Sequence, residues 1–267
     1  GFSGPNAHVV GEEGPEGEEE EKEERPYYFV PVSGKSEEAV RALAGRYAAR
    51  LREDEGLRLS DLCQTAGRGR THFGNRVGVV GATRAEVEQR LERYSRGEGE
   101  ERGVYEGKVE EGGRIAFLFS GQGAQYAGMG QELYRTERRF REVIEESEEL
   151  LRGELERPLT EVMYGGEGGR LEETRYTQPA LFALEYGLSQ VWESWGIRPW
   201  ALLGHSVGEY VAASVAGVFG MAEGLKLIAA RGRLMQETEA DGRMEAVYAS
   251  EAEVEEVVRG QEEVAIA

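Results

Sequence analysis

Residues 201–209 read Ala-Leu-Leu-Gly-His-Ser-Val-Gly-Glu, and this stretch decides the fold. The apolar run 200–203 predicts a buried strand, and the residues from Glu209 to Val218 predict a helix. The turn between these two elements has the pattern G-x-S-x-G. A serine on such a tight strand-to-helix turn is held out from the backbone, and the flanking glycines avoid collisions with neighbouring backbone. The stretch therefore predicts an α/β fold that presents Ser206 at the end of a strand.

The predicted turn gives Ser206 the surroundings of a nucleophile. The helix that follows points its first amides and the positive end of its dipole at the place where negative charge develops during attack on a carbonyl carbon. A tight turn with an incidental serine is the alternative interpretation. The strand before Ser206 and the helix after it favour the nucleophile.

A second glycine-rich turn, Gly121-Gln122-Gly123, follows another apolar run. Residues 115–119 predict a buried parallel strand. Glycines after this strand let the backbone approach a ligand closely, and the amide of Gln122 is free to point into a cleft. A dinucleotide-binding fingerprint is not completed, because Tyr126 occupies the position of its last glycine. Taken alone, a turn without a functional role is the commoner explanation.

Composition excludes several classes of protein. The 267 residues suffice for one large domain or two modest ones, and the net charge of −19 argues against a nucleic-acid partner. A single cysteine, Cys63, rules out an intrachain disulfide and a cysteine-built zinc site, and three histidines make a histidine-rich metal site improbable. No apolar stretch reaches the roughly 20 residues that cross a bilayer, and the N-terminus has no signal pattern. We expect a soluble, cytoplasmic protein with no metal and no membrane contact.

Four zones divide the chain. Residues 1–10 predict a turn and a short strand, and the Gly/Pro/Glu-rich residues 11–26 predict an acidic flexible linker. Residues 27–105 predict a small α/β unit, and residues 113–267 predict a second one. Within the small unit we expect strands at 27–32 and 76–80, with helices that begin after Ser36, at Leu59 and after Thr83. In the larger unit we expect strands at 115–119, 200–203 and 243–250, and helices at 137–152, 179–195, 209–218 and 222–236.

Three motifs in this order make a family resemblance specific. They are Phe119-Ser120-Gly121-Gln122-Gly123-Ala124-Gln125, Thr177-Gln178-Pro179-Ala180-Leu181-Phe182 and Gly204-His205-Ser206-Val207-Gly208-Glu209-Tyr210. Together they resemble the acyltransferase domain of modular polyketide synthases and its relative, malonyl-CoA:acyl carrier protein transacylase. The small unit resembles the linker domain between ketosynthase and acyltransferase. Residues 1–10 resemble the last strand of the ketosynthase, from which Pro5 departs.

The resemblance implies a fold and a set of site residues. The fold would be a small α/β linker domain followed by a parallel-sheet, hydrolase-like core, with an incomplete ferredoxin-like subdomain from near residue 243. Ser206 would be the nucleophile, and the backbone amides of Gln122 and Val207 would form the oxyanion hole. Arg231 matches the arginine that binds the malonyl carboxylate, for which a guanidinium fork is suited. His205 would be a second substrate-binding residue, and its position just before the serine suggests that it shapes the turn.

The resemblance also implies a reaction and partners. An acyl group would pass from coenzyme A to Ser206, and then to the phosphopantetheine thiol of an acyl carrier protein, without a bound cofactor. The partners would be malonyl-CoA, the carrier protein and the ketosynthase domain of the same synthase, in a homodimeric assembly. Val207 and residues 173–179 resemble members that load malonyl rather than methylmalonyl units. We therefore expect malonyl to be favoured.

One departure from the family pattern keeps alternatives open. Family members use a histidine downstream of the serine as general base, but no histidine follows His205 here. Neither His8 nor His72 is a credible substitute, so we expect a fragment that is inactive or slow by itself. A serine esterase or thioesterase-type hydrolase is one alternative function. A structural linker or docking unit without catalysis is the other.

Overall fold

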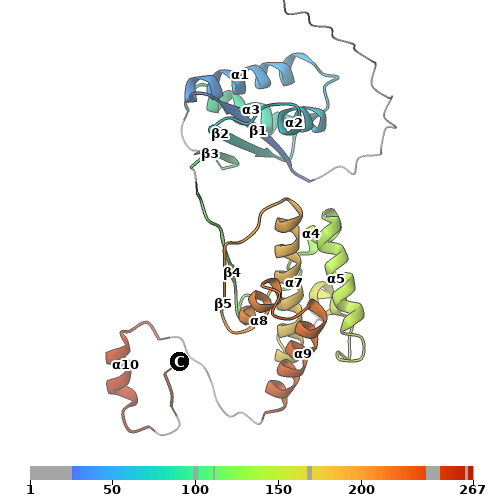
Figure 1. Ribbon diagram of the computed structural model, residues 1–267, viewed down its shortest axis with the longest axis vertical. Coiled ribbons are helices and arrows are strands. Elements are labelled where there is room, and N and C mark those ends of the chain that lie inside the picture. Colours follow the sequence, from blue (N-terminus) through green and yellow to red (C-terminus); the bar gives the residue numbers. More distant parts are fainter. Residues whose placement is uncertain are drawn as a thin grey trace, which may run out of the picture. The chain divides into compact units, whose positions relative to one another are not determined.

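The computed structural model describes residues 26–98, 102–110, 112–166, 170–238, 247–261 and 264–266. The chain separates into two compact units, and the division falls between Gly113 and Arg114 (Figure 1). The strand expected within residues 1–10 lies outside the described residues. So does the acidic linker expected at 11–26, apart from its last residue.

The first unit is a three-stranded antiparallel sheet with helices packed on it (Figure 1). Its strands lie in the order β1-β2-β3, and every second residue at the end of β1 and β2 is buried, so that Val30, Val32, Val77 and Val79 join the core from one face of the sheet. The predicted caps form: the hydroxyls of Ser36 and Thr83 accept hydrogen bonds from Ala39 N and Glu86 N, each at 3.2 Å. The elements are β1 (Tyr28–Gly34), α1 (Glu37–Glu53), α2 (Leu59–Arg68), β2 (Asn75–Gly81), α3 (Arg84–Ser95) and β3 (Val104–Lys108).

The third strand, β3, was not predicted. It pairs with β2 along its whole length, from Val79 opposite Val104 to Asn75 opposite Lys108. Four of its five residues are exposed. An edge strand of this kind carries no alternation of apolar and polar residues, and this alternation is the signal by which sequence reasoning finds a strand.

The second unit is built on two parallel strands that the sequence places 80 or more residues apart. β4 (Ala116–Phe119) pairs with β5 (Ala201–Gly204), with Ala116 opposite Ala201 and Phe119 opposite Gly204. This parallel pair and the helices around it confirm the predicted α/β class. The helices are α4 (Gln131–Thr136), α5 (Arg138–Leu150), α6 (Leu159–Tyr164), α7 (Thr174–Ser194), α8 (Val207–Val215), α9 (Met221–Glu237) and α10 (Glu251–Val258).

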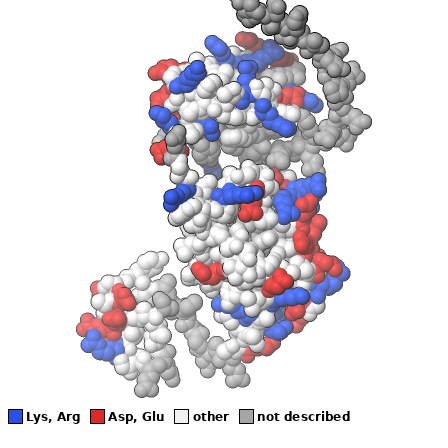
Figure 2. Space-filling view, viewed as in Figure 1, with Lys and Arg blue, Asp and Glu red and all other residues white. Residues whose placement is uncertain are grey.

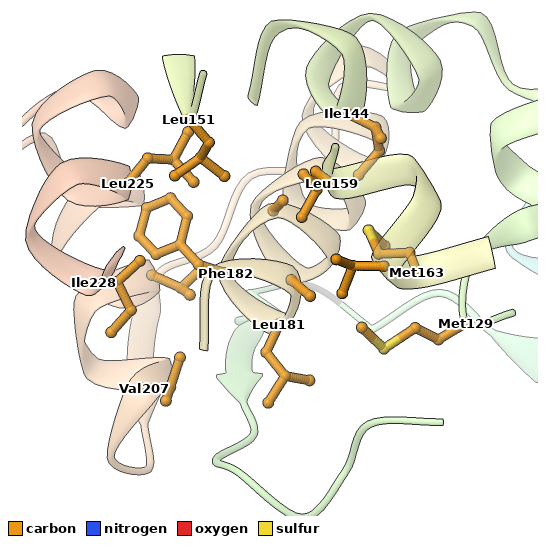
Figure 3. Packing of buried hydrophobic residues seen from close by; sticks show 14 of the residues in the cluster. Met129, Ile144, Leu151, Leu159, Met163, Leu181, Phe182, Val207, Leu225 and Ile228 are labelled. Atoms are coloured by element: carbon orange, nitrogen blue, oxygen red, sulfur yellow. The ribbon is translucent and has the colours of Figure 1, made fainter. Parts of the chain in front are cut away.

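Helix α7 lies at the centre of the second unit and packs against α5, α8 and α9. Figure 3 shows Phe182 of α7 directed toward Leu225 and Ile228 of α9, and all three side chains are fully buried. The helix begins at Thr174, five residues before its predicted start at Pro179. Proline lacks an amide hydrogen and disfavours helix before it, so Pro179 was the expected boundary. The earlier turn forms because the Thr177 hydroxyl donates to the carbonyls of Leu171 and Glu173, at 2.5 and 3.0 Å.

Two glycines let α9 approach α7 closely. A β-carbon added at Gly224 would lie 2.6 Å from the Phe182 ring, and one added at Gly232 would lie 2.9 Å from the carbonyl oxygen of Thr174. Real β-carbons do not sit so close to other heavy atoms, and a backbone carbonyl cannot move aside cheaply. The contact at Gly232 therefore sets the position of the neighbouring residue, Arg231.

The strand expected at 243–250 is not found in the part of it that the structure describes. Residues 243–246 lie outside the described residues, and residues 247–250 form no strand. Ser250 instead caps α10 in a capping box with Glu253, whose carboxylate accepts hydrogen bonds from Ser250 N at 2.9 Å and Ser250 Oγ at 2.6 Å. This local cap starts a helix at the end of the predicted strand.

Charged side chains of both signs are mixed over the surface in Figure 2. Many form pairs one helical turn apart, such as Arg138 with Glu142 at 2.8 Å and Arg157 with Glu161 at 2.5 Å. Exposed pairs of this kind contribute little to stability, typically below about 1 kcal/mol. None of the helices in the described ranges is long and apolar enough to cross a membrane. Over the same ranges, no cluster of three or more His, Cys, Asp or Glu residues is arranged to hold a metal ion.

Replacing Gly232 by Ala should destabilise the second unit by roughly 1–3 kcal/mol, because the new methyl group meets the backbone of α7. The direction of the change in unfolding free energy is informative, since alanine in a helix interior is otherwise favoured over glycine by about 1 kcal/mol. Urea unfolding followed by tryptophan fluorescence measures this, because Trp192, Trp195 and Trp200 all lie in the second unit. The control is Lys226→Ala on the exposed face of α9. A stabilised Gly232→Ala variant would contradict the close packing.

Cys63 on α2 should react slowly with alkylating reagents in the folded chain. Burial raises the pKa of its thiol to about 11 from an ordinary value of 9.0, so the reactive thiolate is scarcer by about 100-fold near pH 8. Iodoacetamide labelling of native chain, compared with chain in urea and followed by intact-protein mass spectrometry, measures the ratio. Equal rates in the two states would contradict the shift.

Candidate active site

The turn between β5 and α8 is strained at the predicted nucleophile. Ser206 has φ 54° and ψ −107°, and among the described residues it is the one non-glycine residue with positive φ. Such backbone conformations cost about 1–3 kcal/mol and gather at functional sites. The side chain of Ser206 is exposed rather than packed in the core. The structure therefore presents this hydroxyl to solvent on a sharp elbow.

Two glycines make the elbow possible, because backbone packs directly on backbone there. A β-carbon at Gly204 would lie 2.1 Å from the amide nitrogen of Glu209, and one at Gly208 would lie 2.4 Å from the carbonyl oxygen of Phe119. The first contact sets the first turn of α8 against the end of β5, and the second sets it against the end of β4. A hydrogen bond from His205 N to Phe119 O, 3.0 Å long, ties the elbow to β4 as well.

The bend Gly121–Gly123 lies directly against this elbow. A β-carbon at Gly121 would lie 2.4 Å from Nδ1 and 2.9 Å from the carbonyl oxygen of His205. The predicted nucleophile turn and the predicted oxyanion bend are therefore neighbours, although 80 residues separate them in sequence. The ring of His205 packs on Gly121. The other described histidine, His72, lies in the first unit with Nε2 2.8 Å from the Gly67 carbonyl oxygen.

Several backbone amides at this junction have no hydrogen-bond acceptor within the part of the chain that the structure describes. On α8, Gly208 N donates to His205 O at 3.0 Å and Glu209 N donates to Ser206 O at 3.1 Å, whereas the amide of Val207 has no such partner. On the bend, Gly123 N donates to Gln125 Oε1 at 2.7 Å, whereas the amide of Gln122 has no such partner. The sequence analysis assigned the amides of Val207 and Gln122 to an oxyanion hole.

Arg231 of α9 reaches the elbow. Its Nη2 lies 3.4 Å from Ser206 Oγ, and its Nη1 donates to Gln178 Oε1 at 2.7 Å. The guanidinium also lies over the Tyr210 ring, 5.7 Å from the centroid. It forms no ion pair with any Asp or Glu in the described ranges, whereas Arg233 pairs with Glu154 at 3.7 Å. An arginine held only by neutral groups keeps its charge available for an anionic ligand.

The buried side chain of Gln178 connects Arg231 to the bend. Gln178 Nε2 donates to Gln122 Oε1 at 3.4 Å, and Gln122 Nε2 donates to Thr174 Oγ1 at 3.1 Å. Gln178 belongs to the second of the three family motifs, but no role was predicted for it. The sequence does contain a signal for Gln178, since its polar amide interrupts an apolar run of α7. A fully buried amide needs hydrogen-bond partners, so such a residue is expected to bind neighbouring groups.

Glu185 is a second polar residue on α7 that sequence reasoning missed. Its Oε1 accepts hydrogen bonds from the amide and the hydroxyl of Ser120, at 2.8 and 2.5 Å. Burial raises the pKa of the Glu185 carboxyl above its ordinary value, although the bonds from Ser120 act in the opposite direction. A buried acid therefore lies beside the residue that opens the bend.

Two family models match the chain. One, described as "Acyl transferase domain", matches residues 116–267, which include the bend, the elbow and Arg231. The other, described as "CurL-like, PKS C-terminal", matches residues 28–91 in the first unit. The two matches therefore fall on the two separate units of the structure.

Curated relatives are large polyketide synthases. The chain is 42% identical over 262 residues to polyketide synthase GfsB of Streptomyces halstedii, a match that covers 97% of this chain and 5% of that protein. It is 40% identical over 268 residues to mycoketide-CoA synthase of Mycobacterium tuberculosis, covering 99% of this chain and 6% of that protein. The chain thus spans a small fraction of the length of these relatives.

Solved acyltransferase domains have the same fold. The acyltransferase domain of ZmaA matches with a TM-score of 0.75 at 35% identity, over 81% of this chain and 50% of that one. The acyltransferase domain from module 8 of the salinomycin polyketide synthase matches with a TM-score of 0.72 at 31% identity, over 79% of this chain and 50% of that one. The hydrolase-like acyltransferase fold expected from the sequence is confirmed. The chain belongs to the acyl transferase family, in the branch found in modular polyketide synthases.

Proposed function

We propose that this chain provides the nucleophile and the carboxylate-binding group for transfer of a malonyl-type unit from coenzyme A to an acyl carrier protein. One observation carries the proposal: the guanidinium of Arg231, without a carboxylate partner in the described residues, lies 3.4 Å from the hydroxyl of the strained Ser206. A cation beside a presented hydroxyl suits a substrate that has both a reactive carbonyl and a negative charge.

The first step forms an acyl-serine. Ser206 Oγ bonds to the thioester carbonyl carbon, the carbon–sulfur bond breaks, and coenzyme A leaves as a thiol with the proton that the hydroxyl gave up. Negative charge develops on the carbonyl oxygen in between. The unoccupied amides of Gln122 and Val207 are the donors we assign to it, and donors of this kind are worth about 10²–10³ in rate each.

The second step reverses the first with a different thiol. The phosphopantetheine sulfur of the carrier protein bonds to the acyl carbon, the ester bond to Ser206 breaks, and the serine regains a proton. The chain needs no cofactor of its own for either exchange. The carrier protein, and a ketosynthase of the same homodimeric synthase that uses its acyl group, are the partners we propose.

Arg231 is the group we assign to the free carboxylate of the substrate. In a malonyl group one carbon separates this carboxylate from the reacting carbonyl, so its partner must lie close to the nucleophile. The acyltransferase domain of SpnD, 32% identical with a TM-score of 0.68, is a complex with 2-(pent-4-yn-1-yl)malonyl, and a malonyl-type ligand in that relative supports the same class here. We propose malonyl over methylmalonyl on the grounds of Val207 and residues 173–179.

The general base is not among the described neighbours of Ser206. The hydrogen-bond partner of its hydroxyl in the described residues is Arg231, which cannot accept a proton. The His205 ring packs on Gly121 instead, and we assign it the role of shaping the elbow. Acylation by the 267-residue chain should therefore be slow.

Incubating the chain with malonyl-CoA should produce a slow single acyl adduct on Ser206, visible by intact-protein mass spectrometry. The Ser206→Ala variant should show none, and Cys63→Ser should leave the adduct unchanged because the native thiol is mostly protonated. With malonyl-CoA and methylmalonyl-CoA in competition, the malonyl adduct should dominate. Absence of any adduct would favour a structural or docking role. Steady hydrolysis of simple esters without a carrier protein would favour the hydrolase alternative.

Arg231→Ala should slow acylation by malonyl-CoA by roughly 10–100-fold, as expected for a lost charge-assisted hydrogen bond of about 1.5–3 kcal/mol. Acylation by acetyl-CoA, which has no carboxylate, should change little. Arg231→Lys should recover part of the rate, since it keeps the charge but not the fork. Arg233→Ala, two residues along α9, is the matched control. Equal losses with both thioesters would contradict carboxylate recognition by Arg231.

A further inference from the structure

The buried acid Glu185 has no part in the proposed chemistry. Its side chain is 7% exposed, and its second oxygen, Oε2, has no hydrogen-bond partner in the part of the chain that the structure describes. An unsatisfied buried carboxylate oxygen costs free energy, and an apolar side chain of similar size would avoid that cost. The other surroundings of Glu185, which include Phe119, Leu188 and Trp192, are mostly apolar. The burial of this costly carboxyl group therefore indicates that Glu185 has a specific role in the site.

Where β4 ends, Glu185 takes the place of a neighbouring strand as hydrogen-bond acceptor for the backbone. The ladder between β4 and β5 ends at the pair Phe119 and Gly204, and the chain then turns into the bend. The next amide, that of Ser120, donates to Glu185 Oε1 instead of to a strand, and the Ser120 hydroxyl donates to the same oxygen. One carboxylate oxygen thus fixes both the backbone and the side chain of the residue before Gly121.

Helix α7, which carries Glu185, also holds the bend at a second point. Gln178 and Thr174 both bind the side chain of Gln122. Thr174, Gln178 and Glu185 are spaced at i, i+4 and i+11, so they lie on one face of α7. This polar face binds residues on both sides of Gly121. The position of the Gln122 amide relative to the elbow is therefore set from α7 rather than by the glycine-rich bend alone.

We propose that Glu185 is a positioning residue, which fixes Ser120 and so aims the amide of Gln122 at the oxyanion of the acyl transfer. The proposal rests on the proposed function, because the Gln122 amide is an oxyanion donor only if the chain carries out acyl transfer. The anchoring of the bend by Glu185 can be measured without any reaction. Glu185 acts through Ser120 and contacts no reacting atom.

The first measurement is amide hydrogen exchange of the peptide that covers the end of β4 and the bend, in the full 267-residue chain. Glu185→Leu removes both acceptor contacts and should raise exchange there by about tenfold or more, as expected for loss of a charge-assisted hydrogen bond. Glu185→Gln keeps an acceptor oxygen and should stay close to wild type. Ser120→Ala, which leaves the core of α7 untouched, should give an intermediate increase. Glu193→Leu, two turns further along α7, is the matched control.

The second measurement is reaction of Ser206 with an alkyl fluorophosphonate, in which the serine oxygen bonds to phosphorus, fluoride leaves and the hydroxyl proton passes to solvent. The oxygen on phosphorus then occupies the proposed oxyanion position. Glu185→Leu should lower the maximal rate by about 10–100-fold, within the range for loss of one oxyanion donor, and leave the half-saturating concentration unchanged. Glu185→Gln should restore the rate to within about threefold of wild type.

Three results would overturn the inference. Unchanged exchange in a folded Glu185→Leu variant would show that Glu185 does not anchor the bend, whatever the function of the chain. Raised exchange with an unchanged phosphonylation rate would make it a purely structural residue. If Glu185→Leu does not fold, then wild-type exchange in Ser120→Ala would overturn the inference by itself. A wild-type chain that does not react at Ser206 would contradict the proposed function, and exchange alone would then decide the anchoring.

Discussion

The second unit depends on one contact, the packing of the first turn of α8 directly on the ends of β4 and β5. Gly204 and Gly208 permit this contact, since any side chain at either position would overlap with backbone atoms about 2 Å away. Because α8 begins so close to both strands, the chain has no room for a relaxed connection, and Ser206 takes the strained conformation with φ 54°. The packing of α8 on the core, through Val207 and Val211, holds that strain in place.

Helix α7 connects this elbow to the rest of the site. Its apolar side chains, such as Phe182, fill the core of the second unit, and its polar face binds the bend and Arg231. Gly232 brings α9 close enough for Arg231 to reach both Gln178 and Ser206. The proposed oxyanion amide of Gln122 and the proposed carboxylate ligand Arg231 are therefore held by the same helix. A disturbance of α7 should alter both, even though neither set of groups belongs to it.

The sequence predicted those parts of the site whose geometry is local. The elbow and the bend follow from glycines and a serine within a few residues of one another, and the flanking apolar runs located both strands. Gln178 and Glu185 escaped prediction because their partners, Gln122 and Ser120, lie 56 and 65 residues away. The start of α7 was placed too late because Pro179 normally excludes helix before it, and hydrogen bonds from Thr177 overcome that preference. β3 lacked the apolar alternation that reveals a strand. Residues 247–250, the described part of the strand predicted at 243–250, lead instead into α10, which Ser250 caps.

The central claim is that the strained serine presents its oxygen to the amides of Gln122 and Val207, which have no acceptor among the described residues. A crystal structure of the chain after phosphonylation of Ser206 tests it most directly. We expect a phosphoryl oxygen at about 2.7–3.1 Å from the amide nitrogens of both Gln122 and Val207, the range for oxyanion donors. A phosphoryl oxygen that points into solvent, with both amides still unbound, would contradict the account.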